Sequence, residues 1–87
     1  MVRTVDVPAP AYPKTPESIA IGRLIRGARD RVGVSGAELA RRVGTSPVVI
    51  THVETGHRKA SVGRRLAIAN ALGVPLSDLL LESEVGS

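Results

Sequence analysis

The sequence lacks cysteine, phenylalanine and tryptophan and contains one tyrosine, Tyr12, in 87 residues. Without cysteine it has no disulfide framework, no thiolate nucleophile and no cysteine-ligated zinc site. No apolar run is long enough to cross a membrane, and residues 1–10 lack the apolar stretch of a secretory signal. The length suits one small domain and excludes most enzymes with two substrate sites. Any core must be built from aliphatic side chains.

Acidic residues are scarce in the middle of the chain, although the net charge over all residues is only +4. Residues 16–73 contain ten arginines or lysines against four acidic residues, whereas residues 74–87 contain three acidic residues and no basic one. A basic body with an acidic end is typical of a protein that turns one face to a polyanion. Many small domains have such a bias without using it, so other features must support this interpretation.

Four prolines interrupt the first sixteen residues, and no helical periodicity joins them. Proline removes a backbone donor and favours extended geometry in the residue before it. We therefore expect residues 1–15 to form a flexible arm. This arm is either a disordered tail or a segment whose Arg3 and Lys14 touch DNA, and the first interpretation is favoured because unanchored termini are usually mobile.

After the arm, residues that start and end helices alternate along the chain. The candidate N-caps, whose hydroxyls accept a backbone hydrogen bond, are Thr15, Ser35, Ser46 and Ser61. The glycines suited to ending each helix in the left-handed conformation are Gly33, Gly44, Gly56 and Gly73. Ser35 and Glu38 have the spacing of a capping box, and Ser77 is expected to cap a fifth, short helix over Asp78–Leu81.

Apolar residues recur at intervals of three and four within these helices, which predicts one buried face on each. Nothing alternates with period two over a useful length, so no strand is expected. The prediction is a compact all-α domain of five helices over residues 16–81, followed by a polar tail over residues 82–87. Its expected core residues are Ile21, Leu24, Ile25, Ala28, Val32, Leu39, Ala40, Val43, Ile50, Val53, Leu66, Ile68, Ala69 and Leu72.

The segment from Ser35 to Gly56, SGAELARRVGTSPVVITHVETG, reads as a helix, a tight turn and a second helix. With the later stretch ANALGVPL at residues 69–76, it resembles the Cro and phage-repressor type of helix-turn-helix domain, the xenobiotic-response-element family of bacterial regulators. The resemblance spans about residues 21–80. It implies a repressor-like fold in which the helix after Ser46 enters the DNA major groove.

Helical steps of about 100° place the outward residues of this helix on one arc. By the resemblance, the residues expected to reach base edges are Pro47, Val48, Thr51 and His52. Valine suits a thymine methyl, threonine can donate or accept a hydrogen bond, and histidine can donate to guanine or phosphate. Because this arc lacks arginine, asparagine and glutamine, we expect modest direct readout, helped by DNA shape and dimer spacing. Val48 could instead contact a protein partner.

Phosphate contacts need cations and the free amides of helix N-termini. The residues expected to contact the DNA backbone are Ser35, Gly36, Arg41, Arg42, Ser46, Thr55, Arg58, Lys59 and Arg64. For each single arginine, a solvated surface position is an equally good interpretation. The family commonly has glutamine where this chain has Gly36. The side chain that would support this phosphate contact is therefore absent here, although the backbone amide remains.

Two further positions follow from the resemblance. Arg29 and Glu54 stand where the family often forms a semi-buried ion pair, so Glu54 is expected to be structural and not catalytic. Arg65 stands where a core aliphatic residue is usual. Two arrangements are expected for it. Either the side chain extends its charged end to solvent, or the fourth helix is slightly rotated.

Catalytic interpretations find little support in the sequence. His52 and His57 lack a nearby third ligand, the serines are explained as caps, and no glycine-rich phosphate loop or nucleophile elbow is present. No metal, cofactor or catalytic residue is expected, and an enzyme is not expected. The missing aromatics also disfavour binding of single-stranded nucleic acid by base stacking.

The sequence thus predicts a transcriptional regulator, a repressor or autoregulator in the prokaryotic cytoplasm and nucleoid, that binds double-stranded DNA at a palindromic operator as a homodimer. The alternative is a protein-interaction module of the same fold, an antitoxin or adaptor. The chain could also be the DNA-binding part of a longer regulator. The expected dimer surface lies in the leucine-rich end and comprises Val74, Leu76, Leu79, Leu80 and Leu81.

Overall fold

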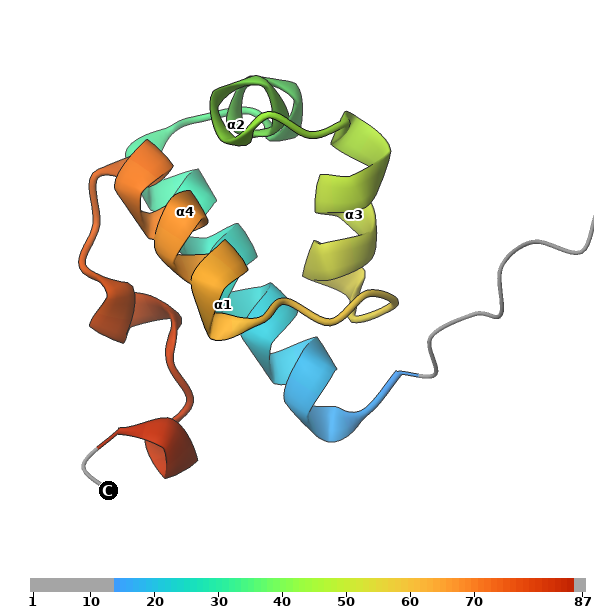
Figure 1. Ribbon diagram of the computed structural model, residues 1–87, viewed down its shortest axis with the longest axis vertical. Coiled ribbons are helices and arrows are strands. Elements are labelled where there is room, and N and C mark those ends of the chain that lie inside the picture. Colours follow the sequence, from blue (N-terminus) through green and yellow to red (C-terminus); the bar gives the residue numbers. More distant parts are fainter. Residues whose placement is uncertain (1–13, 86–87) are drawn as a thin grey trace, which may run out of the picture.

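The computed structural model describes residues 14–85, so the expected arm lies outside this part except for Lys14 and Thr15. Within it the chain is entirely helical, and no strand is present. The helices pack around one another, and α3 lies at the edge of the molecule away from the C-terminal 3₁₀ turns (Figure 1). The elements are α1 (Pro16–Val32), α2 (Gly36–Val43), α3 (Pro47–Thr55), α4 (Val62–Leu72), η2 (Leu76–Leu79) and η3 (Glu82–Glu84).

The four α-helices begin and end at the residues that the sequence marks. Each predicted N-cap hydroxyl accepts a backbone amide hydrogen bond, and each of the four predicted glycines has the left-handed conformation. One capping detail is wrong. At the start of α2, the Glu38 side chain bonds to arginines instead of returning to the backbone of Ser35. A capping box is formed instead at the start of α1, between Thr15 and Ser18.

The core gathers the inward faces of all four helices together with η2. Its largest fully buried side chains are Ile25, Leu39, Ile50, Val53, Ile68 and Leu79. Two expected core residues are wrong, because Val32 and Leu66 are 43% and 46% exposed. Val32 is the last residue of α1, and Leu66 faces away from the buried side of α4, where Arg65 is buried instead.

Helices α1 and α3 approach so closely that a side chain at Gly22 has no room. A Cβ there would lie 2.6 Å from the carbonyl oxygen of Val53 and would also collide with that of Glu54. Nearby, the buried hydroxyl of Ser18 donates to the carbonyl of Gly56 at 2.9 Å. These two residues of α1, for which the sequence carries no distinguishing signal, determine how closely α3 lies against α1.

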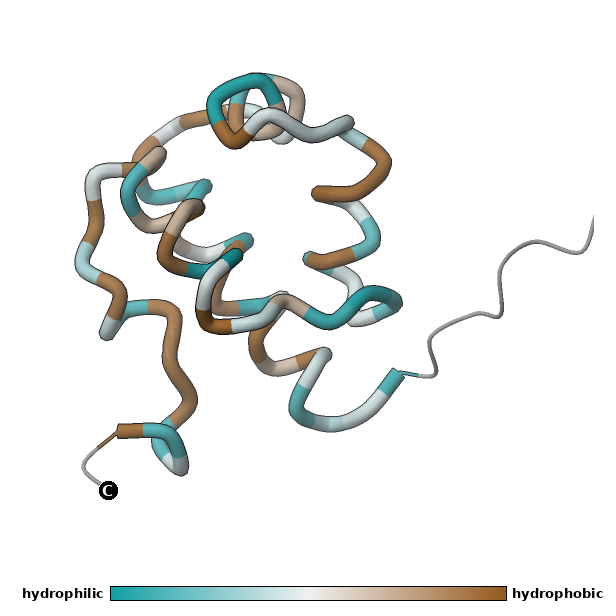
Figure 2. Tube along the Cα trace, in the orientation of Figure 1, coloured by the Kyte–Doolittle hydropathy of each residue, from teal (hydrophilic) through white to brown (hydrophobic). Residues whose placement is uncertain are grey.

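The leucine-rich end differs from the expected fifth helix over Asp78–Leu81. It forms the two short 3₁₀ turns η2 and η3. Ser77 lies inside η2, and the N-cap position is held by Pro75, which makes no side-chain hydrogen bond. The apolar residues between the turns are the brown stretch before the C-terminus in Figure 2. Leu79 is fully buried in its own core, which removes it from the expected dimer surface. The other four residues of that surface are half-buried.

Arg65 follows neither of its two expected alternatives. It stays on the buried side of α4, only 3% exposed, and pairs with Glu84 of η3 through two hydrogen bonds of 2.7 and 2.8 Å. The guanidinium, together with the backbone amide of Leu81, lowers the pKa of Glu84 to about 2. The buried cation is thus neutralised by a carboxylate from the end of the chain.

Candidate nucleic-acid interface

The two helices of the central unit, α2 and α3, meet through a turn of three residues that contains Gly44 in the left-handed conformation. The inward residues Ile50 and Val53 anchor α3 against α1 and α2. The opposite face of α3 is open. Its exposed residues are the four expected to reach base edges, Pro47, Val48, Thr51 and His52, together with Thr55, which was expected to contact the DNA backbone.

The chemistry of this open face differs from one end to the other. Val48, 60% exposed, offers apolar surface near the N-terminus of the helix. The Thr55 hydroxyl near the C-terminus donates to the carbonyl of Thr51 at 2.9 Å and lies 2.9 Å from Nδ1 of His57. Because its single hydroxyl proton is used within the protein, Thr55 has no free donor for a phosphate. Thr51 and His52 therefore carry the donors of this face.

His57 lies beside this face, whereas the sequence suggested only a potential cation of the loop and a metal ligand that lacks partners. Its ring is exposed and lies edge-on to that of His52, with the two ring centroids 6.1 Å apart. The Thr55 hydroxyl and Nδ1 of His57 share a hydrogen bond of 2.9 Å. The position of His57 directly after the C-cap of α3 was the available signal.

Free backbone amides lie at the starts of α2 and α3. The hydroxyl of Ser35 accepts from the amide of Glu38, and that of Ser46 accepts from the amide of Val49. The amides of the first helical turn have no carbonyl partner within the helix. In α2 these include Gly36, whereas Pro47 removes one from α3. The α2 N-terminus therefore has one more free amide than the α3 N-terminus.

The predicted backbone-contacting cations fall into two groups. Arg41 and Arg42 both donate to the carboxylate of Glu38, and Arg42 also donates to the carbonyl of Ala71. These hydrogen bonds lower the pKa of Glu38. The other three predicted cations, Arg58, Lys59 and Arg64, form no ion pair within residues 14–85 and lie in the α3–α4 loop and at the start of α4. This second group can bind phosphate without first breaking a pair.

The expected ion pair between Arg29 and Glu54 is present. Arg29 donates to both carboxylate oxygens, at 2.7 and 3.0 Å, and to the carbonyl of Val34 at 2.9 Å. The two side chains are only 12% and 7% exposed. Bonding to Glu54 raises the pKa of Arg29 further. The pair joins α1, α3 and the α1–α2 loop, so it helps to hold α3 in place.

Residues 14–85 contain no group of three His, Cys, Asp or Glu side chains that could hold a metal ion. In the same part of the chain, no helix has both the length and the apolar character of a membrane span.

The helix-turn-helix domain family matches this chain over residues 20–81. No curated protein sequence matches it. Two solved structures similar to it are of regulators. The restriction-modification controller protein C.AhdI from Aeromonas hydrophila is 28% identical, with a TM-score of 0.70 over 74% of this chain and 93% of that chain. The clp gene regulator ClgR from Corynebacterium glutamicum is 27% identical, with a TM-score of 0.72 over 76% and 86%.

The same fold also forms part of an enzyme. Hydroxypropylphosphonic acid epoxidase from S. wedmorenis is 25% identical, with a TM-score of 0.67, and the match covers 74% of this chain but 34% of the enzyme. The match to the two regulators instead extends over most of their length. The chain therefore belongs to the helix-turn-helix domain family, in the arrangement of the Cro and phage-repressor type.

Proposed function

We propose that this protein is a transcriptional regulator that binds duplex DNA in a sequence-specific manner through the open face of α3. The observation that carries the proposal is the exposed side of α3, backed by the buried anchor residues Ile50 and Val53. The unpaired cations of the α3–α4 loop would contact phosphates beside it. The gene regulator ClgR and the controller protein C.AhdI, which share the fold over most of their length, support a regulatory role.

We further propose that the protein acts in the bacterial cytoplasm as a repressor or autoregulator, on a palindromic operator and as a homodimer. One recognition helix presents few base contacts, whereas two helices spaced by about 34 Å read symmetric half-sites. With Leu79 buried, the contact between the copies would use the half-buried Val74, Leu76, Leu80 and Leu81. Sedimentation as a monomer both alone and on the selected site would rule out the homodimer.

Selection of binding sites from random duplex DNA, followed by a salt titration, tests the function. A DNA-binding regulator should enrich a palindrome. Its affinity should fall with increasing salt, with a slope of about −0.9 for each phosphate neutralised. Failure to enrich any sequence, combined with no salt-dependent binding to random duplex, would eliminate the proposal.

Two sets of variants separate base contacts from phosphate contacts. The double variant Thr51→Ala, His52→Ala should narrow the affinity ratio between the selected site and random DNA, because each lost base contact is worth about 1–3 kcal/mol of discrimination. Arg58→Ala should weaken both complexes alike and reduce the salt slope by about 0.9. Fluorescence anisotropy with the two duplexes measures both effects. Identical profiles for the two sets would contradict these role assignments.

Restoring the family's glutamine at Gly36 should strengthen DNA binding. A Cβ at this position would meet only Cγ2 of Ile50 at 3.9 Å and Cζ of Arg29 at 4.0 Å, which are ordinary contacts. Gly36→Gln should increase affinity by about two- to tenfold, the range for one added hydrogen bond to phosphate. Gly36→Ala is the matched control, because it stabilises the helix without adding a donor. Equal affinities of the two variants would mean that no phosphate lies beside this position.

A protein-interaction module, such as an antitoxin or adaptor, is the second candidate function. The exposed apolar residues Val62 and Leu66 of α4 favour it, with Val48 on α3. The exposed side of α4 carries no charge from Val62 to Asn70 apart from the partly buried Arg64 at its edge. Tight binding of a protein partner with little salt dependence, in the absence of DNA binding, would favour this second function.

A further inference from the structure

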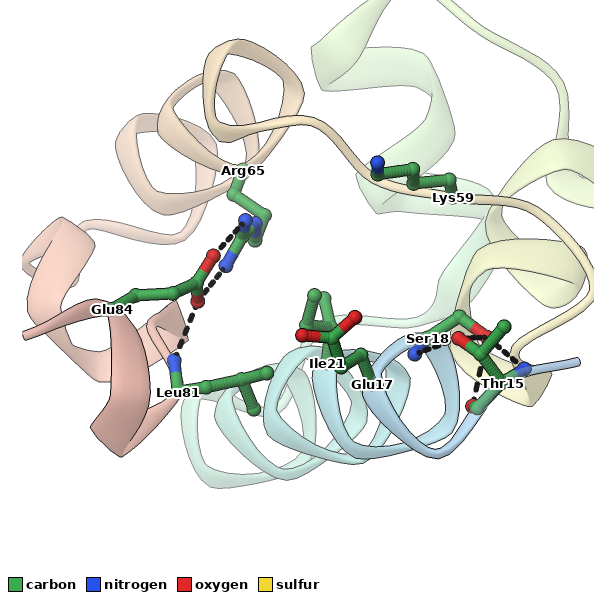
Figure 3. A pocket seen from close by; sticks show the side chains of 8 residues that line it. All are labelled: Thr15, Glu17, Ser18, Ile21, Lys59, Arg65, Leu81 and Glu84. Carbon is green, nitrogen blue, oxygen red and sulfur yellow. Dashed lines mark hydrogen bonds and ion pairs between the residues drawn. The ribbon is translucent and has the colours of Figure 1, made fainter.

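The buried Arg65 side chain contacts three other segments of the chain, and Figure 3 shows its pairing with Glu84, which also bonds to the amide of Leu81. From α4 its Nε donates to the carbonyl of Ala60 at 3.1 Å, and one terminal nitrogen donates to the carbonyl of Leu79 at 3.0 Å. Both terminal nitrogens donate to the carboxylate of Glu84, whose Oε1 also accepts from the amide of Leu81 at 2.7 Å. The α3–α4 loop is thereby connected to the C-terminal turn η3.

The contact with Ala60 fixes the second end of the α3–α4 loop. The first end is fixed where the Ser18 hydroxyl donates to the carbonyl of Gly56. Ala60 is itself buried, at 2% exposure, whereas His57, Arg58 and Lys59 between the two ends are exposed. The direction in which the loop presents its cations therefore depends on its two anchors.

The orientation of Arg65 depends in turn on Glu84. The Arg65 side chain is only 4% exposed, and Glu84 is its one ion-pair partner within residues 14–85. A guanidinium left in this position without a counter-charge would be drawn towards solvent, because burial of an unpaired charge is strongly unfavourable. Turning to solvent would break its bond to Ala60. Glu84 lies beyond residues 20–81, which the family match covers.

We propose that Glu84, acting through Arg65, is a positioning residue for the α3–α4 loop and for the DNA-contacting cations of that loop. The inference rests on the proposed function for its effect on DNA. The anchor itself can be tested without DNA.

The first test compares Glu84→Gln with Glu82→Gln. Both variants remove one negative charge from η3, and the Glu82 side chain forms no hydrogen bond or ion pair within residues 14–85. Removing an acidic residue by itself should leave binding to a short random-sequence duplex unchanged or slightly stronger, as we expect for Glu82→Gln. Glu84→Gln should instead weaken binding by about tenfold, the loss of one charged phosphate contact, and reduce the salt slope by about 0.9.

A second variant covers the case in which Glu84→Gln does not fold. The double variant Arg65→Met, Glu84→Gln replaces the ion pair with neutral side chains of similar size, and such replacements usually preserve stability. It still removes the donor to Ala60, so it should bind the duplex as weakly as Glu84→Gln while showing a cooperative thermal transition. Wild-type affinity and salt slope in either folded variant would overturn the proposal.

Hydrogen exchange gives a readout that does not depend on DNA. At the second end of the loop, next to Ala60, the amide of residue 64 donates to the hydroxyl of Ser61 and the amide of residue 65 donates to its carbonyl. They should exchange faster in Glu84→Gln and in the double variant than in Glu82→Gln. If the wild type binds no duplex, the proposed function fails, and the exchange rates still decide whether Glu84 positions the loop. Unchanged exchange in a folded variant would refute the anchor.

Discussion

Replacing Gly22 with alanine should lower the free energy of unfolding by about 3 kcal/mol, at the upper end of the usual cost of overpacking. The new Cβ would lie 2.6 Å from the carbonyl oxygen of Val53 and would collide with that of Glu54. Both obstacles are backbone atoms, so no side-chain rotation relieves the clash, and α1 and α3 must move apart. Urea denaturation measures the loss of stability. Because α3 carries the open face, sequence-specific DNA binding should weaken as well.

Gly27 provides the matched control in the same helix. A Cβ there would meet only the end of the Arg31 side chain, at 3.7 Å. Gly27→Ala should therefore stabilise the protein by about 0.5–1 kcal/mol, the usual gain from replacing a helical glycine. The two substitutions are chemically identical and have opposite expected signs. A stability gain in Gly22→Ala would show that the crossing of α1 and α3 is looser than described.

Arg29→Met should cost about 3–5 kcal/mol, the range for removing one partner of a buried ion pair. The substitution keeps an aliphatic side chain but leaves the Glu54 carboxylate, 7% exposed, without its cation. It also removes the donor to the carbonyl of Val34. Thermal denaturation followed by circular dichroism should show a lower Tm, by about 4–8 °C for each kcal/mol in a domain of this size.

Arg26→Met controls for the loss of one arginine from α1. Arg26 pairs with Asp30 at 3.3 Å, but both side chains are about 60% exposed. Exposed pairs contribute about 0–1 kcal/mol, so this variant should remain close to the wild type. Comparable losses in Arg26→Met and Arg29→Met would contradict a special role for the pair with Glu54.

The helices and the open face of α3 follow from local chemistry, which is why they could be predicted. A hydroxyl before a helix and a glycine after it satisfy backbone groups within a few residues. The caps at Ser46 and Gly56 therefore fix α3 without information from the rest of the chain. Once a helix and its buried residues are known, helical periodicity determines the opposite face, and Val48 and Thr51 lie there as expected.

The contacts between distant segments could not be predicted in the same way. No local signal distinguishes Gly22 from Gly27. Yet Gly22 faces backbone carbonyls of α3, whereas Gly27 faces the flexible side chain of Arg31. Leu79 and Leu80 are identical in type, and only packing decides that the first is buried in the core. In each case the deciding atoms belong to another part of the chain.

Local chemistry is enough to specify the four α-helices, their ends and the residues on the open face of α3, because caps and helical periodicity act over short distances. The close crossing at Gly22 and the pairing of Arg65 with Glu84 depend on how distant segments pack in the folded chain. An arginine at a core position is stable there only if a carboxylate from elsewhere neutralises it. Here Glu84, 19 residues further along the chain, does so. Whether the two side chains come together depends on the path of the folded backbone, which local sequence patterns do not specify.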